Sequence, residues 1–171
     1  MDNTNLGDGI AESHLTRVPG GRALKSVSEG LQSARAMPRP TVLIADDHAV
    51  VLDRLVSLLK DHFEVLGTAV NGTLLIEAAA RLCPDVVVTD ISMPGLNGLE
   101  ALRQLKTACS ETKVILLTMD ADAEVATHAI RSGASGFLTK FSATDELVPA
   151  INEVLQGRVY VTPAVNRQPS A

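Results

Sequence analysis

The feature that most constrains this chain is a fivefold alternation between short β-type runs and stretches of helical periodicity. The expected strands cover about 41–45, 63–70, 85–89, 113–118 and 135–139. A helical pattern follows each of them, over about 48–60, 71–82, 97–107, 122–132 and 142–157. The third strand carries three consecutive valines, Val86 to Val88, as in strands that are covered on both faces. Five successive β–α units predict an α/β fold, a doubly wound parallel sheet with helices on both faces.

Composition narrows the function classes that this sheet can serve. Aromatic residues make up only 2% of the 171 residues, so the core must be aliphatic and base stacking on aromatic rings is disfavoured. Residues 40–171 carry ten basic and sixteen acidic side chains, a balance that repels phosphate backbones and favours divalent cations. Direct nucleic-acid binding is therefore not expected. No apolar run exceeds four residues, so a membrane span and a signal-peptide core are not expected either.

The two ends of the chain differ in character from its centre. Residues 1–39 are rich in Gly, Ser, Asn and Arg with little apolar periodicity, and we interpret them as a disordered N-terminal extension. Met37 lies just before the first strand, and a start of translation at this residue is an open alternative. We expect the folded domain to cover 40–158, and residues 159–171 to form a C-terminal tail.

Polar residues follow four of the five expected strands. Asp46 and Asp47 end the first strand, Asp90 the third, Thr118 the fourth and Lys140 the fifth. In doubly wound sheets the carboxyl ends of the strands form the functional site. Three neighbouring carboxylates resist ionising together unless a divalent cation joins them, and oxygen ligands favour Mg²⁺. A lysine and a hydroxyl beside them suit a phosphoryl group, so the set predicts phosphoryl transfer onto a carboxylate.

These motifs resemble the receiver domain of bacterial two-component response regulators, and their wording most resembles the NarL/FixJ (LuxR-type) subfamily. The resemblance covers 41 to about 163 and rests on four segments: VLIADDH at 42–48, DVVVTDISMPGLNG at 85–98, LLTM at 116–119 and GASGFLTK at 133–140. It implies a flavodoxin-like, CheY-like sheet with strand order 2-1-3-4-5 and five helices. It also implies a cytoplasmic bacterial phosphoprotein in a phosphorelay, not an enzyme but a switch that assists its own phosphorylation and dephosphorylation.

The resemblance assigns a role to each residue of the set. Asp90 corresponds to the phosphoacceptor, which takes a phosphoryl group from a phosphohistidine of a sensor histidine kinase or phosphotransfer protein. Asp46 and Asp47 correspond to the acidic pair that binds Mg²⁺ together with Asp90 and the main-chain carbonyl of Ser92. Lys140 corresponds to the residue that bridges to the phosphoryl group.

Further residues correspond to the family's switch. Thr118 matches the hydroxyl that moves to meet the phosphoryl group, and Phe137 matches the aromatic residue that turns inward when it does. Ser92 and Asp120 stand where the family tunes the lifetime of the phosphate. The alternative for Phe137, which the match to the switch position makes the weaker one, is an ordinary core residue.

Two features depart from the subfamily pattern. Only fourteen residues follow Gly157, too few for the helix-turn-helix output domain that members of the subfamily usually add. The chain is then a stand-alone receiver or a truncated regulator, which acts through a protein partner or a missing output domain, and homodimerisation is a further expectation. Pro149 falls within the last helix and should kink it, because proline cannot donate to the carbonyl four residues back.

Competing interpretations remain for the same sheet. The first is a receiver-like interaction module that acts independently of phosphate. The second is a Mg²⁺-dependent phosphatase, which would place a second Asp two residues after Asp90, where this chain has Ser92. The third, a flavin mononucleotide carrier, conflicts with Asp46 and Asp47 in the loop that would cradle its phosphate.

Three other residues have a plain structural reading. His48 reads as the start of the first helix beside the predicted site. Cys83 and Cys109 have no metal-ligand spacing, and we expect them to be reduced, inert residues at helix ends.

Overall fold

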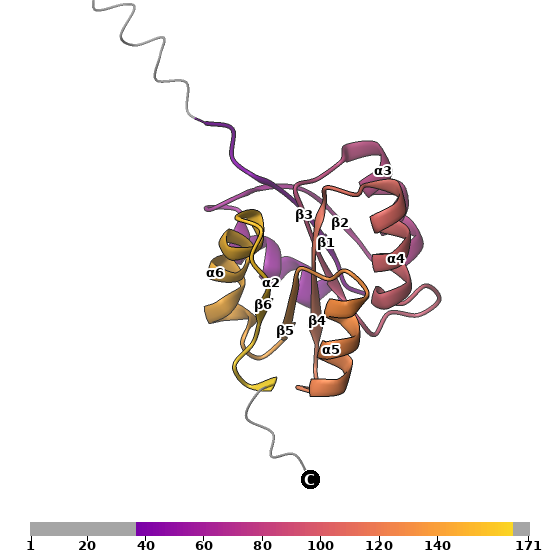
Figure 1. Ribbon diagram of the computed structural model, residues 1–171. Helices are drawn as coiled ribbons and strands as arrows, with labels where there is room; N and C mark the ends of the chain where they lie inside the picture. The colour runs from indigo at the N-terminus through magenta and orange to yellow at the C-terminus, as the bar shows by residue number, and fades with distance from the viewer. Residues whose placement is uncertain (1–36, 166–171) are drawn as a thin grey trace, which may run out of the picture. The chain divides into compact units, whose positions relative to one another are not determined.

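The computed structural model describes residues 37–165, so most of the predicted N-terminal extension lies outside the described residues (Figure 1). The strands are β1 (Thr41–Ala45), β2 (Glu64–Ala69), β3 (Val86–Asp90), β4 (Lys113–Thr118), β5 (Gly136–Thr139) and β6 (Tyr160–Val161). The helices are α2 (Ala49–Leu59), α3 (Gly72–Leu82), α4 (Gly98–Ala108), α5 (Ala123–Arg131) and α6 (Ala143–Leu155). Each of the ten predicted elements is present, with ends within about two residues of the prediction.

All strands are parallel and form one sheet of order β2-β1-β3-β4-β5-β6. The predicted fold class and the order 2-1-3-4-5 are therefore confirmed. The short strand β6 is an addition, formed within the predicted C-terminal tail, and it pairs with β5 through Gly136 opposite Tyr160. Beyond it, the amide of Thr162 donates to the Phe137 carbonyl at 2.9 Å, and Val165 is buried.

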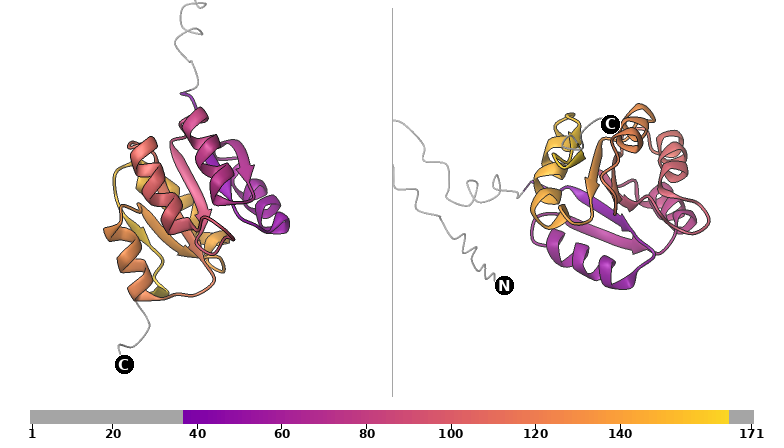
Figure 2. Two further views of the ribbon diagram at one scale, coloured as in Figure 1. Left: turned by 90° about the vertical axis from the view of Figure 1, so that its right-hand side faces the viewer. Right: turned by 90° about the horizontal axis from the view of Figure 1, so that it is seen from below.

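Helices cover both faces of the sheet (Figure 2), and an apolar layer holds them to it on each face. On one face α2 and α6 bury residues such as Leu55 and Ile151 against Val88 of β3. On the other face α3, α4 and α5 pack against Val87 and Phe137. The strand residues alternate between the two layers because successive side chains point to opposite faces. The side chains are almost all aliphatic, as the composition predicts.

Asparagine side chains cap the starts of α3 and α4, whereas the serine before α6 does not cap its helix. The Asn71 side chain accepts from the amide of Leu74 at the start of α3. Asn97 and Glu100 form a complete capping box at the start of α4, which fixes the direction in which the chain leaves the β3–α4 loop. Ser142 is the N-cap of α6, but its hydroxyl bonds Thr139 instead of the helix. Helix α6 continues through Pro149.

Candidate functional site

The predicted polar residues gather at one edge of the sheet. Asp46 directly follows β1, Asp90 and Thr118 are the last residues of β3 and β4, and Lys140 directly follows β5. In a parallel sheet these carboxyl ends meet at the same edge. The hydrogen bond from the Lys140 amide to the Thr118 carbonyl, at 2.7 Å, extends the β4–β5 ladder into this edge.

Lys140 joins two of the carboxylates directly. Its Nζ lies 2.5 Å from Asp46 Oδ2 and 3.0 Å from Asp90 Oδ2, and both aspartates are buried. Burial alone would lower the pKa of Lys140, but the hydrogen bonds and charges of Asp46 and Asp90 outweigh burial and raise it above its usual value. Lys140 therefore stays an ammonium and compensates part of the negative charge at this edge.

Asp46, Asp47 and His48 form a compact group around the start of α2. Asp46 Oδ1 accepts from the His48 amide at 2.9 Å and lies 3.1 Å from His48 Nδ1. The same ring nitrogen lies 3.0 Å from Asp47 Oδ1, yet that buried oxygen has no hydrogen-bond partner among the described residues. His48 is the N-cap of α2, as predicted, but its ring contacts with both aspartates were not foreseen. The ring reaches Asp46 and Asp47 because His48 is the N-cap residue of α2.

The β3–α4 loop holds the Asp90 side chain through Oδ1, whereas Lys140 contacts Oδ2. The Ser92 amide donates to Asp90 Oδ1 at 3.2 Å, and the Gly98 amide donates to the Ile91 carbonyl at 3.0 Å. A Cβ on Gly98 would lie 2.4 Å from the Asp90 carbonyl oxygen, so only glycine allows α4 to begin this close. The sequence therefore brings the start of α4 against the backbone of the predicted phosphoacceptor.

Thr118 and Asp120 lie side by side at the end of β4. The Asp120 amide donates to Thr118 Oγ1 at 3.2 Å, so the hydroxyl is held within its own loop. Thr118 is buried and Asp120 is exposed. Phe137 lies in β5 with no exposed side-chain surface, inside the apolar layer beneath α3, α4 and α5. The aromatic ring is thus fully buried in this structure.

The donor set at this edge suits a divalent cation. The Lys140 ammonium contacts two of the three carboxylates, and Oδ1 of the third, Asp47, has no hydrogen-bond partner among the described residues. Carboxylate oxygens are the ligands that Mg²⁺ prefers. One ligand atom from each of Asp46, Asp47 and His48 lies within 4.8 Å of the others, a spacing that can hold an ion. The residues present therefore fit the metal that the sequence predicts.

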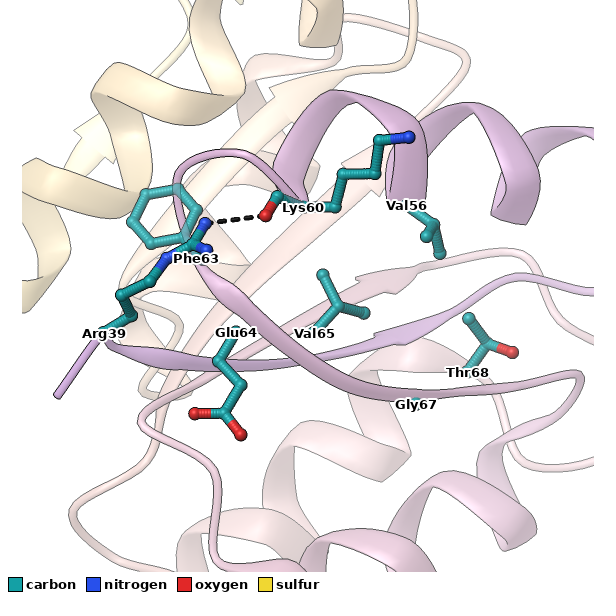
Figure 3. A pocket seen from close by; sticks show the side chains of 8 residues that line it. All are labelled: Arg39, Val56, Lys60, Phe63, Glu64, Val65, Gly67 and Thr68. Atoms are coloured by element: carbon teal, nitrogen blue, oxygen red, sulfur yellow. Dashed lines mark hydrogen bonds between the residues drawn. The ribbon is translucent and has the colours of Figure 1, made fainter.

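A surface pocket lies away from these residues. It lies along β2 and α2 and has a volume of about 620 Å³. Figure 3 shows its lining side chains, among them Arg39, whose Nη2 donates to the Lys60 carbonyl at 2.6 Å. Its lining includes Phe63 and Thr68 but none of the residues predicted for phosphoryl transfer. This pocket is therefore separate from the acidic group at the carboxyl ends of the strands.

Comparison with known families matches residues 42–152 to the response regulator receiver domain. The chain belongs to the response regulator receiver family. It is 36% identical over 129 residues to the response regulator GacA of Pseudomonas aeruginosa, covering 74% of this chain and 60% of GacA. It is 38% identical over 123 residues to the oxygen regulatory protein NreC of Staphylococcus epidermidis, covering 70% of this chain and 56% of NreC.

A solved structure supports the same assignment. A LuxR-family two-component response regulator from Aurantimonas sp. SI85-9A1 superposes with a TM-score of 0.72 at 29% identity, covering 75% of this chain and 94% of that chain. The LuxR family is the NarL/FixJ group that the motifs resemble. The chain spans about 60% of the length of the curated relatives named here.

The matched segment is a response regulator receiver domain, and the relatives named here are regulators. None of the helices in residues 37–165 has both the length and the apolar character required to cross a membrane.

Proposed function

We propose that this chain is a phosphoacceptor switch whose receiver unit covers residues 40–158 and which is phosphorylated on Asp90. One observation carries the proposal: two buried carboxylates, those of Asp46 and Asp90, share the ammonium of Lys140. Beside them lies a third carboxylate, that of Asp47, whose Oδ1 has no hydrogen-bond partner among the described residues. A site with this excess of negative charge attracts a cation, and a cation then allows an anionic phosphoryl group to approach Asp90.

The proposed reaction transfers one phosphoryl group from a phosphohistidine to Asp90. A carboxylate oxygen of Asp90 forms the new P–O bond, the P–N bond breaks, and the donor imidazole leaves and takes up a proton. Lys140 Nζ lies 3.0 Å from Asp90 Oδ2, where its ammonium can pair with an oxygen of the transferred group. The product is an acyl phosphate on Asp90 that water later hydrolyses.

Mg²⁺ is the cofactor we assign to this site. Asp46, Asp47, Asp90 and the Ser92 carbonyl would hold it, and the bound ion would neutralise charge on the phosphoryl oxygens. The proposed ligands lie at the end of β3 and in the loops that follow β1 and β3, so the sheet fixes their spacing. His48 belongs to the surroundings of the metal, because its ring contacts Asp46 and Asp47.

We assign the switch to Thr118 and Phe137. The Thr118 hydroxyl would give up its bond from the Asp120 amide to donate to the phosphoryl group, drawing the β4–α5 loop toward Asp90. Phe137 fills the space beneath α5, so its ring and that loop can move together. Ser92 and Asp120, both exposed beside the site, are the positions where the attacking water and its access are controlled.

The proposed partners follow from this role. The phosphoryl donor is a sensor histidine kinase or a phosphotransfer protein in the bacterial cytoplasm. The output passes to a protein partner or to an output domain outside these residues, with homodimerisation as a further route. Direct nucleic-acid binding by the receiver unit itself is not proposed, because residues 40–171 carry a net negative charge.

The test is the intact mass of the protein after incubation with acetyl phosphate and Mg²⁺. We expect the wild type to gain one phosphoryl group, and the gain to disappear when Mg²⁺ is chelated. Asp90→Asn should gain none, whereas Asp61→Asn, which changes an exposed acid after α2, should behave as the wild type. Phosphorylation of the Asp90→Asn protein would show that the phosphoacceptor is misassigned.

The alternative is a phosphate-independent interaction module. It would be favoured if the wild type accepted no phosphoryl group from acetyl phosphate, phosphoramidate or a phosphorylated histidine kinase. Normal signalling by Asp90→Asn in cells would favour it as well. Against it stands the complete set of three carboxylates, hydroxyl and lysine, all placed at one edge of the sheet.

A further inference from the structure

The two cysteines, far apart in the sequence, end neighbouring helices. Cys83 is the C-cap of α3 and Cys109 is the C-cap of α4. These helices run side by side on one face of the sheet (Figures 1 and 2), and both begin at the edge that holds the acidic group. Their C-terminal ends therefore meet at the opposite edge, and each brings a thiol.

Hydrogen bonds at the end of α3 place the two cysteines in contact with the same backbone group. The Ala79 carbonyl accepts from the Cys83 amide at 2.8 Å and from the Cys109 thiol at 3.4 Å. The Cys83 thiol lies 3.9 Å from the next carbonyl, that of Ala80. Burial raises the pKa of Cys109, and the nearby Cys83 thiol raises it further, which is consistent with adjacent sulfurs.

Solvent can reach this pair from one side. Cys83 is exposed and Cys109 is half-buried. Both line a surface pocket of about 490 Å³ between the ends of α3 and α4, together with Asp85 and Glu111. A small thiol or disulfide can enter such an opening and reach the exposed sulfur first.

We infer that Cys83 and Cys109 form a reversible intramolecular disulfide when the protein meets a low-molecular-weight disulfide such as oxidised glutathione. Each sulfur lies within 4 Å of a carbonyl in the last turn of α3, those of Ala79 and Ala80, and rotation about one side-chain bond can turn the two sulfurs toward one another. Within residues 37–165 the potential metal-binding group involves neither cysteine, so a dithiol couple is the simpler chemistry. The inference is independent of the proposed function.

The chemistry is two successive exchange steps. The Cys83 thiolate attacks glutathione disulfide, forms a mixed disulfide and releases one glutathione thiolate, which takes up a proton. The Cys109 thiol then loses its proton and attacks the Cys83 sulfur, forming the Cys83–Cys109 bond and releasing the second glutathione. The two cysteines lose two electrons and two protons in total, and glutathione disulfide gains both as two molecules of glutathione.

The test is native oxidation of the full chain with glutathione disulfide, followed by alkylation, intact-mass measurement and peptide mapping. We expect the wild type to lose two hydrogens, to resist alkylation at both cysteines, and to recover on reduction. Cys109→Ser should instead keep one glutathionyl group on Cys83, because the resolving thiol is gone. Cys83→Ser should gain less glutathione than Cys109→Ser, because Cys109 is half-buried.

Two results would overturn the inference. The first is a wild type that accumulates glutathionyl groups or disulfide-linked dimers without the internal cross-link. The second is a wild type whose two cysteines stay reduced, whether or not Cys109→Ser becomes glutathionylated under the same conditions. Both serine variants should still accept a phosphoryl group from acetyl phosphate, since the cysteines precede β3 and β4 whereas Asp90 and Thr118 end them. If the wild type itself accepts no phosphoryl group, this result would contradict the assignment of Asp90 as phosphoacceptor but would not affect the disulfide inference.

Discussion

At the scale of single residues, Lys140 decides whether the acidic group can stay buried. It pairs with Asp46 and Asp90 at once, and Asp46 has no exposed side-chain surface. Lys140→Met should lower the free energy of unfolding by about 3 kcal/mol in the absence of Mg²⁺, because the buried carboxylates lose their counter-charge. Urea unfolding measures this loss.

The same variant has a control and a metal dependence. Lys60→Met removes an exposed lysine at the end of α2 and should change the unfolding free energy by no more than about 0.5 kcal/mol. Mg²⁺ should restore part of the stability that Lys140→Met loses, since an ion can replace the missing charge. An equal loss in the two variants would show that Lys140 is an ordinary surface residue.

The sequence predicted the positions of Asp46, Asp90, Thr118 and Lys140 because each one marks the end of a strand. It did not predict that His48 would contact both neighbouring aspartates, because that depends on a side-chain orientation at the N-cap of α2. The individual roles of these residues stay predictions until the phosphorylation experiment is done.

At the scale of the elements, the start of α4 is positioned by a close backbone contact. A Cβ at Gly98 would lie 2.4 Å from the Asp90 carbonyl oxygen and 2.8 Å from Ile91 Cα, and neither backbone atom can move aside alone. Gly98→Ala should cost about 3 kcal/mol of unfolding free energy and slow phosphorylation by acetyl phosphate, because α4 must shift away from Asp90.

Gly95 provides the matched control for Gly98. It lies in the same loop with φ of +78° and nothing within 4 Å of an added Cβ, so Gly95→Ala meets backbone strain without a clash. Its cost should be about 1 kcal/mol. Thermal or urea unfolding of the pair separates the effects, and equal losses would rule out the contact with Asp90 as the cause.

Helix α6 contains a proline that should destabilise it. Pro149 is exposed in the middle of Ala143–Leu155, where it cannot donate to the Asp145 carbonyl. Pro149→Ala should raise the unfolding free energy by about 2 kcal/mol, the gain in helix propensity less the extra freedom of the unfolded chain. Asn152→Ala, another exposed position of α6, should gain no more than about 0.7 kcal/mol. A Pro149→Ala gain no larger than this would mean that the helix already tolerates proline at little cost.

Elements with their own periodicity were predictable, and elements that depend on a neighbour were not. β6 has two residues, too short for any alternation, and it forms because β5 offers an unpaired edge. The meeting of Cys83 and Cys109 likewise depends on how α3 and α4 pack, which spacing along the chain does not reveal. The sequence correctly predicted that both cysteines lie at helix ends, but their proximity depends on tertiary packing.

At the scale of the whole molecule, the topology concentrates charge at one edge. The chain carries a net charge of −5, and the parallel sheet brings Asp46, Asp47 and Asp90 together at the carboxyl ends of β1 and β3. Asp46 and Asp90 are buried, so salt screens their repulsion poorly. The fold itself is therefore less stable than it would be with a cation in place.

Mg²⁺ should relieve this repulsion and stabilise the folded chain. At a free concentration one hundred times its Kd, the free energy of unfolding should rise by about 2.7 kcal/mol, because the ion binds the folded state alone. Asp47→Asn, which alters the carboxylate whose buried oxygen has no partner, should unfold less readily than the wild type without Mg²⁺ and gain less when Mg²⁺ is added. Urea unfolding across a Mg²⁺ titration, with NaCl at matched ionic strength as control, distinguishes specific binding from screening. The same gain in NaCl, or an undiminished Mg²⁺ gain in Asp47→Asn, would place the stabilising ion somewhere other than this edge of the sheet.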